Sequence, residues 1–166
     1  MHPLGPGLRV RASGGWHPRG MPSVDLIDET FVAAPPARVA TRVADPAQWR
    51  RWWPDRRLVV FMDRGERGIR WSIAGDLVGS AEIWLEPVLD GTLVHYFVRA
   101  EPPGGAGSGG AAAAQGRRGA RLRAREAKSW KRQVWALKDE LESDRRPGEP
   151  AAGGPAGRGP AVKSAG

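Results

Sequence analysis

The chain has 166 residues, close to the size of one ordinary domain, and its 23 glycines and 15 prolines fall mostly in residues 1–22, 103–119 and 146–166. Such segments bury too little apolar surface to offset the entropy of ordering them. We therefore expect a disordered leader at 1–22, a disordered tail at 146–166 and one domain at 23–145 with a low-complexity Gly/Ala linker at 103–119. Cysteine is absent, which excludes disulfide frameworks, iron–sulfur clusters and thiol nucleophiles.

The net charge is +8, but residues 23–102 are nearly neutral and the basic excess lies in the chain ends and in residues 117–146. Aromatic and basic side chains do not alternate along one strand as stacking platforms require, so we expect no nucleic-acid partner. The longest apolar run is 58–62, far shorter than a membrane span, and the first 20 residues do not resemble a signal peptide. The sequence predicts a cytoplasmic protein with no membrane span.

The first predicted element is a strand over residues 24–33, which are rich in β-branched and aromatic residues and stop at Pro35-Pro36. These prolines suit the first turn of a short helix. Asp45 suits the cap of a second helix over 46–53, which carries three tryptophans.

After the second helix, the sequence pattern is typical of β-strands, with turn dipeptides between apolar runs. The predicted strands are 57–63, 68–74, 78–87 and 92–101.

The Asp90-Gly91 dipeptide predicts a two-residue type I′ hairpin between the last two strands. The resulting register has one apolar face and one mixed face. It places Leu85 opposite Tyr96, Ile83 opposite Val98, Glu86 opposite His95, Trp84 opposite Phe97 and Glu82 opposite Arg99.

The preceding turn allows a two-residue loop or a three-residue loop over 75–77. The longer loop puts Trp71 opposite Ala81 and Ile69 opposite Ile83, which continues the apolar face across three strands. We therefore predict the three-residue loop.

The last predicted element is a long helix over 120–143 whose apolar residues recur at spacings of three and four. This stripe consists of Ala127, Trp130, Val134, Leu137 and Leu141. Basic residues that include Arg121, Arg125, Lys128 and Arg132 lie off the stripe. They form either a solvated face or an electrostatic dock for an acidic partner.

Two motifs with possible chemistry have simpler interpretations. Gly105, Gly107 and Gly110 match a G-x-G-x-x-G pattern, but no strand follows the helix after them, so a linker is favoured over a dinucleotide site. His95 beside Glu86 could act as a general base, but a solvated cross-strand contact is favoured. We predict no catalytic residue, no metal site and no cofactor.

Seven tryptophans fall in the predicted domain, where they either fill a core or line an apolar cavity. Trp71 is predicted to lie near the small residues Gly79 and Ala81, which leaves volume between the sheet and the last helix. This favours the cavity.

Three groups of residues carry a resemblance to a known family. They are Ala34-Pro35-Pro36, Val39, Ala44-Asp45, Trp49 and Trp52-Trp53-Pro54; then Glu82, Trp84, Leu85, Glu86 and Gly91-Thr92; and finally residues 130–142. Together they resemble the START-like (SRPBCC) superfamily, which includes bacterial polyketide cyclase/dehydrase-like proteins. The resemblance covers about residues 24–143 and implies an α+β helix-grip fold, an antiparallel sheet wrapped around a long C-terminal helix. The family usually has six strands between the second and last helices, whereas about four are predicted here, so a smaller or more open cavity is expected.

The resemblance implies binding of a hydrophobic or aromatic small molecule, lipid-like or polyketide-like, between the sheet and the last helix. The predicted ligand-binding residues are Ile69, Trp71, Ile83, Leu85, Tyr96, Val98, Trp130, Val134 and Leu137. One alternative is a polyketide aromatase/cyclase, for which the basic helix would dock an acidic carrier protein. Another is a ligand-free interaction module that uses the basic helix as its working surface.

Overall fold

The computed structural model describes residues 22–104, 112–146 and 149. The predicted leader and tail lie outside these residues, apart from residues 22, 146 and 149. The G-x-G-x-x-G glycines at 105, 107 and 110 also lie outside them.

The elements follow the predicted order. They are β1 (Val24–Val32), α1 (Pro36–Val43), α2 (Pro46–Trp52), β2 (Arg56–Asp63), the short 3-10 helix η1 (Gly65–Arg67), β3 (Gly68–Gly75), β4 (Val78–Val88), β5 (Gly91–Glu101) and α3 (Ala112–Glu142).

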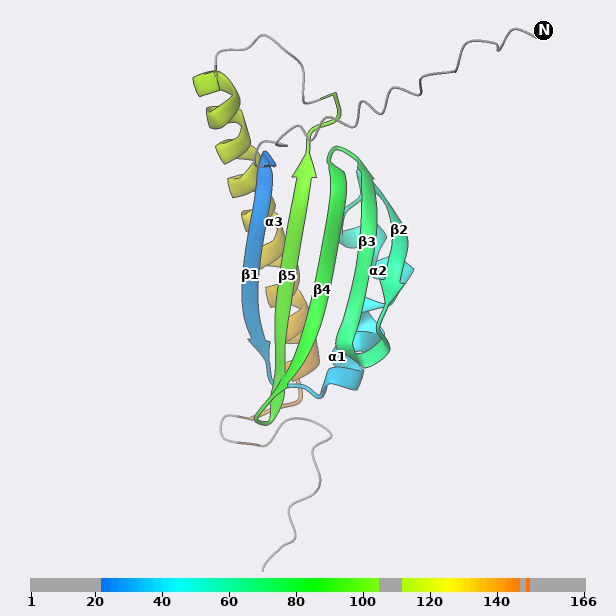
Figure 1. Cartoon of the computed structure of the whole chain (residues 1–166). Coiled ribbons are helices and arrows are strands. Elements are labelled where there is room, and N and C mark those ends of the chain that lie inside the picture. The colour runs from blue at the N-terminus through cyan, green and yellow to red at the C-terminus, as the bar shows by residue number, and fades with distance from the viewer. Residues whose placement is uncertain (1–21, 105–111, 147–148, 150–166) are drawn as a thin grey trace, which may run out of the picture.

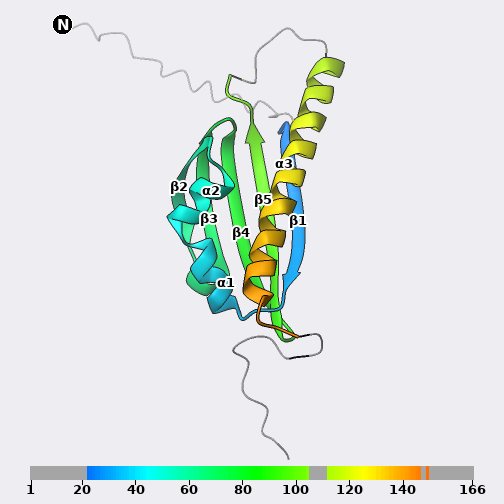
Figure 2. The same ribbon diagram turned by 180° about the vertical axis from the view of Figure 1, so that it is seen from behind.

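The five strands form one antiparallel sheet in the order β1-β5-β4-β3-β2. All three α-helices lie on the same face of this sheet (Figures 1 and 2). In Figure 2, α3 crosses the β1 and β5 side, while α1 and α2 cover the β2 and β3 side. The chain therefore has the predicted α+β helix-grip fold, with one strand before the short helices and four after them.

The short helices begin where local chemistry favours them. Pro36 and Pro46 stand in the first turns of α1 and α2, where the missing N–H of proline has no cost. The Asp45 carboxylate accepts a hydrogen bond from the Ala47 N–H at 2.8 Å, which confirms the predicted cap. At the end of α2, Trp53 leaves the helical conformation directly before Pro54.

The register between β3 and β4 confirms the three-residue turn, because Trp71 pairs with Ala81 and Ile69 with Ile83. Trp71 and Ile83 are fully buried, so the apolar face does continue across these strands toward the helices.

The register between β4 and β5 differs from the prediction by two residues. Val88 pairs with Gly91, so that Leu89 and Asp90 form the loop, and Leu89 takes a positive φ of 51°. Every predicted pair is therefore wrong, and Trp84, for example, faces His95. A shift of two keeps every side chain on its predicted face, since the side-chain period of a strand is two.

The corrected loop follows from packing at Gly91. A Cβ there would meet the Phe31 ring and the Val32 carbonyl oxygen at 2.5 Å. Gly91 is thus a strand residue that pairs with Val88 of β4 and packs closely against β1, and it is not a turn residue.

Helix α3 begins at Ala112, eight residues before the predicted start, so part of the expected linker is helical. Its buried stripe also differs from the prediction: Glu126 is buried, whereas Ala127 is only partly buried. Trp130, Val134, Leu137 and Leu141 are buried as predicted.

The core between the sheet and the helices is filled by aromatic rings. Tyr96 of β5 stacks on Trp130 of α3 with 4.0 Å between ring centroids. Trp53 stacks on both of these rings and meets Trp71 edge-on at 5.8 Å. Trp49 of α2 also packs edge-on against Trp71 at 5.3 Å. Trp49 and Trp53 therefore occupy the volume beside Trp71 that the sequence analysis assigned to a cavity.

Candidate functional site

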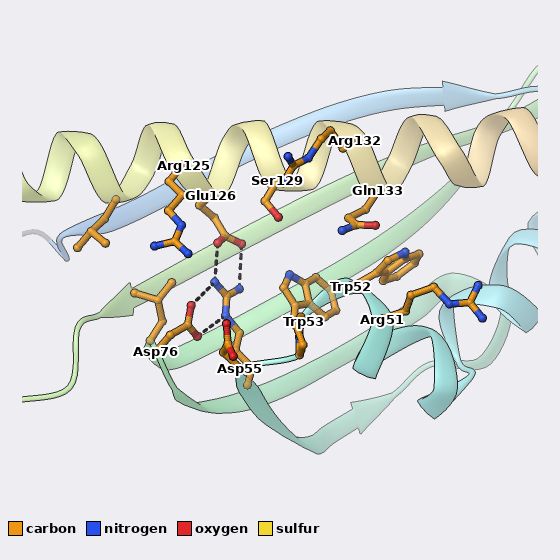
Figure 3. Close-up of a pocket in the computed structure, with 14 residues that line it drawn as sticks. Arg51, Trp52, Trp53, Asp55, Asp76, Arg125, Glu126, Ser129, Arg132 and Gln133 are labelled. Carbon is orange, nitrogen blue, oxygen red and sulfur yellow. Dashed lines mark hydrogen bonds and ion pairs between the residues drawn. The ribbon is translucent and has the colours of Figure 1, made fainter.

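A pocket of about 370 Å³ lies between α3 and the segment that connects α2 to β2 (Figure 3). Its lining comes from the end of α2, the start of β2, the β3–β4 turn and one face of α3. The lining residues are Arg51, Trp52, Trp53, Pro54, Asp55, Arg56, Asp76, Leu77, Leu122, Arg125, Glu126, Ser129, Arg132 and Gln133.

A buried ionic network lies at this pocket. The Arg56 guanidinium donates to both carboxylate oxygens of Glu126, at 2.9 and 2.6 Å, and to both oxygens of Asp76, at 2.8 and 3.2 Å. The Tyr96 hydroxyl donates to Glu126 Oε1 at 2.8 Å. The side chains of Arg56 and Glu126 are only 6% and 4% exposed, so both charges are taken out of water and satisfied by each other.

The network changes the protonation equilibria of its members. Burial raises the pKa of Tyr96 well above its usual value, and the neighbouring Glu126 carboxylate raises it further. Burial alone would lower the pKa of Arg56, but its hydrogen bonds to Glu126 and Asp76 outweigh burial and raise it. Tyr96 is therefore held neutral and Arg56 charged.

This network could not be identified from periodicity alone. Glu126 lies four residues before Trp130, in line with the buried stripe, and it is the one acidic residue among the basic side chains of 117–132. An acid in an apolar stripe indicates a buried ion pair. Its partner Arg56 is 70 positions away in sequence, and only the tertiary structure brings the first residue of β2 within reach of α3.

The nine predicted ligand-binding residues are brought together, but in the core. None of them lines the pocket. Ile69, Trp71, Ile83, Leu85, Tyr96, Val98, Trp130, Val134 and Leu137 are all at most 4% exposed. Trp53 separates two of them, Tyr96 and Trp130, from the pocket, since it lines the pocket and stacks on both rings.

The pocket is bordered by cations that the internal network does not use. Within the described residues, the side chains of Arg125 and Arg132 form no ion pair. Both are exposed on α3, as are Arg121 and Lys128 of the predicted docking face. The basic face of α3 therefore borders the pocket through Arg125 and Arg132.

His95 contacts Glu86 as predicted, although the two residues are not directly opposite. Its Nε2 lies 3.0 Å from Glu86 Oε2, and its Nδ1 lies 3.2 Å from Glu29 Oε1. The imidazole also stacks on Trp84, at 4.7 Å between ring centroids. His95 is remote from the pocket, because it belongs to the sheet face opposite the helices.

No three His, Cys, Asp or Glu side chains among the described residues are grouped so that they could hold a metal ion. None of the described helices has the length and apolar character needed to cross a membrane.

The sheet order and the single helix-covered face define an α+β protein of helix-grip fold. No model of a protein family matches the chain, and no curated protein sequence does. Among solved structures, it is similar to the solution structure of the Aha1 dimer from Colwellia psychrerythraea, with a TM-score of 0.50 and 16% identity over 74% of this chain and 99% of that one. The crystal structure of TTHA0849 from Thermus thermophilus matches with a TM-score of 0.38 and 16% identity over 68% and 98% of the two chains. The first similarity supports the fold alone.

Proposed function

We propose that this protein binds a hydrophobic or aromatic small molecule, lipid-like or polyketide-like, in the pocket between α3 and the segment that connects α2 to β2. The observation that carries the proposal is the pocket itself. Its volume of about 370 Å³ lies within the range of small-molecule sites.

The walls of the pocket supply apolar contact surface. Trp52 and Trp53 line it from α2 and the residue after it, Leu77 from the β3–β4 turn, and Leu122 from α3. Indole rings offer large rigid surfaces on which an aromatic ligand can stack. Burial of such a ligand would contribute about 25 cal/mol per Å² of apolar area removed from water.

Direct contact between a ligand and the nine predicted ligand-binding residues remains a prediction. In the proposal they support the pocket wall from behind, since Tyr96 and Trp130 hold the Trp53 ring in place by stacking. A ligand would meet these residues directly only if the Trp53 ring moved.

Fluorescence titration with N-phenyl-1-naphthylamine tests the proposal, because this neutral aromatic compound becomes emissive in apolar surroundings and accepts energy from tryptophan. We expect saturable binding to the full chain. Ser129→Phe should weaken the binding at least about tenfold, since Ser129 lines the pocket and a phenyl ring there would fill it. The matched control is Lys128→Phe, which places the same ring on the exposed neighbouring position.

The two alternative functions give different outcomes in the same experiment. A ligand-free interaction module would show only linear, non-saturating quenching. A polyketide aromatase/cyclase would bind the compound and also cyclise a linear polyketide chain. Saturable binding that Ser129→Phe leaves unchanged would place the ligand elsewhere and overturn the proposed site.

A further inference from the structure

Charges at the pocket are unevenly satisfied. The carboxylates of Glu126 and Asp76 are both hydrogen-bonded to Arg56, so each has a cationic partner inside the network. Arg125 and Arg132 border the same pocket and have no carboxylate within ion-pair distance among the described residues. The pocket thus combines five apolar side chains with the unpaired guanidinium groups of Arg125 and Arg132, and its lining also includes Asp55, which forms no ion pair among the described residues.

We propose that the pocket recognises an organic acid, an aromatic or apolar molecule whose acidic group is bound by Arg125 and Arg132. This inference rests on the proposed function and specifies the chemical class of its ligand. Guanidinium groups suit this role because they stay charged and present paired N–H donors to the oxygens of an acid.

A buried donor without a partner also points to an acceptor on the ligand. The indole Nε1 of Trp53 is buried and forms no hydrogen bond, although Trp53 lines the pocket and is only 4% exposed. An unpaired buried N–H carries a desolvation cost that an incoming acceptor would relieve. Figure 3 shows this nitrogen on the side of the ring that faces α3, where Glu126 and Ser129 lie.

The arrangement of the two arginines on α3 suits a ligand that enters from this helix. Arg125 and Arg132 are seven residues apart, which is about two helical turns, and Ser129 lies between them on the same face. Figure 3 shows the Arg51 guanidinium pointing away from the pocket centre, so we do not assign it a role in binding the acid.

The electrostatic field of the basic segment of α3 also favours a negatively charged ligand. The helix segment 117–132 contains eight basic residues and one acid, Glu126, whose charge is already neutralised by Arg56. The lining itself holds four arginines and three carboxylates, so the positive excess comes mainly from this basic helix face. A positive field of this kind raises the local concentration of anionic ligands. An acidic ligand is therefore favoured before it makes any direct contact.

A matched pair of fluorescent compounds tests the inference on the full chain. 8-Anilinonaphthalene-1-sulfonate carries an acidic group, and N-phenyl-1-naphthylamine has the same rings without it. In a variant with Arg125→Gln and Arg132→Gln, we expect the affinity for the sulfonate to fall about tenfold or more, which corresponds to about 1.4 kcal/mol. The affinity for the neutral compound should change less than about twofold, because the apolar walls are intact.

The control variant carries Arg121→Gln and Lys128→Gln, which removes the same charge from the same helix at exposed positions that do not line the pocket. We expect it to retain most of the sulfonate affinity. If it loses as much as the pocket variant, the effect is that of the general field, and recognition by Arg125 and Arg132 is overturned.

The Trp53 indole gives an independent readout. In a ¹H–¹⁵N spectrum, assigned with Trp53→Phe, its Nε1–H resonance should move downfield with the sulfonate and not with the neutral compound, because only the sulfonate brings an acceptor.

Two further outcomes separate this inference from the proposed function. Saturable binding of both compounds with no dependence on Arg125 and Arg132 would overturn the acid preference and leave apolar binding in place. Absence of saturable binding for both compounds would overturn the proposed function and this inference together.

Discussion

Arg56 of β2 and Glu126 of α3 form a two-bond ion pair that joins the edge strand to the long helix across 70 positions of sequence. Neither side chain is more than 6% exposed. Because β2 is paired on one side only, this contact and the packing of α2 hold the edge of the sheet against the helices. The same contact closes one side of the pocket.

Removal of Glu126 should therefore destabilise the protein strongly. In Glu126→Ala, Arg56 keeps only Asp76 as a partner and stays largely buried, so we expect the free energy of unfolding to fall by about 3 kcal/mol. Urea unfolding followed by tryptophan fluorescence measures this change. The control is Glu140→Ala, which breaks the more exposed ion pair with Arg42 and should cost at most about 1 kcal/mol. Equal losses in the two variants would contradict a special role for the buried pair.

Alkaline titration should show an abnormal tyrosine. Tyr96 is the single tyrosine of the chain, and burial next to Glu126 raises its pKa well above 10. We expect little tyrosinate absorbance near 295 nm until the protein unfolds. Above pH 10 the unfolded chain releases this proton and the folded chain keeps it, so the free energy of unfolding should fall as pH rises. In Tyr96→Phe that part of the pH dependence should vanish. A reversible tyrosinate signal near pH 10 in folded protein would contradict the buried position.

Glu142 should make stability depend on pH at the acid end. Burial would raise the pKa of this carboxyl, but it accepts hydrogen bonds from Lys138 Nζ and the Ala33 N–H, both at 2.6 Å, and its pKa is lowered from 4.5. The stabilisation is present above the unfolded-state pKa and is lost as pH falls through the folded-state value. Glu142→Gln should therefore be less stable than the native chain at pH 7, and the difference should shrink below about pH 4.5 in denaturant melts. A difference that stays constant with pH would argue against an ionic contribution.

The corrected hairpin predicts opposite effects at two neighbouring positions. Gly91→Ala should destabilise by about 1–3 kcal/mol, because the new methyl group would overlap Phe31 and the Val32 carbonyl. Leu89→Gly should be neutral or stabilising, since Leu89 is fully exposed and holds a positive φ that glycine adopts without strain. Thermal unfolding of the two variants tests the register. If the loop were at residues 90 and 91 instead, Leu89 would be a paired strand residue, and Leu89→Gly would relieve no backbone strain.

Local chemistry in the sequence was sufficient for the element order and for one register. The prolines in the first turns of α1 and α2 and the Asp45 cap act within a few residues, so the helix starts could be predicted. The β3–β4 register was also predictable, because only the three-residue turn aligns Trp71 with the buried face of the next strand. The same reasoning failed at the β4–β5 turn, because a shift of two residues leaves both faces unchanged. There the contact of Gly91 with β1, a strand nearly 60 positions earlier, decides the loop.

The buried aromatic residues were predicted from their pattern, but their role depended on the tertiary structure. Periodicity shows that Tyr96 and Trp130 face inward, and it does not show which rings fill the space between them and the short helices. Trp53 fills that space, so the volume that the sequence predicted at the sheet lies instead on its outer side, beside Arg56 and Glu126. Burial direction is a local property of each element, whereas the pairing of a buried charge and the position of a pocket depend on how distant elements pack.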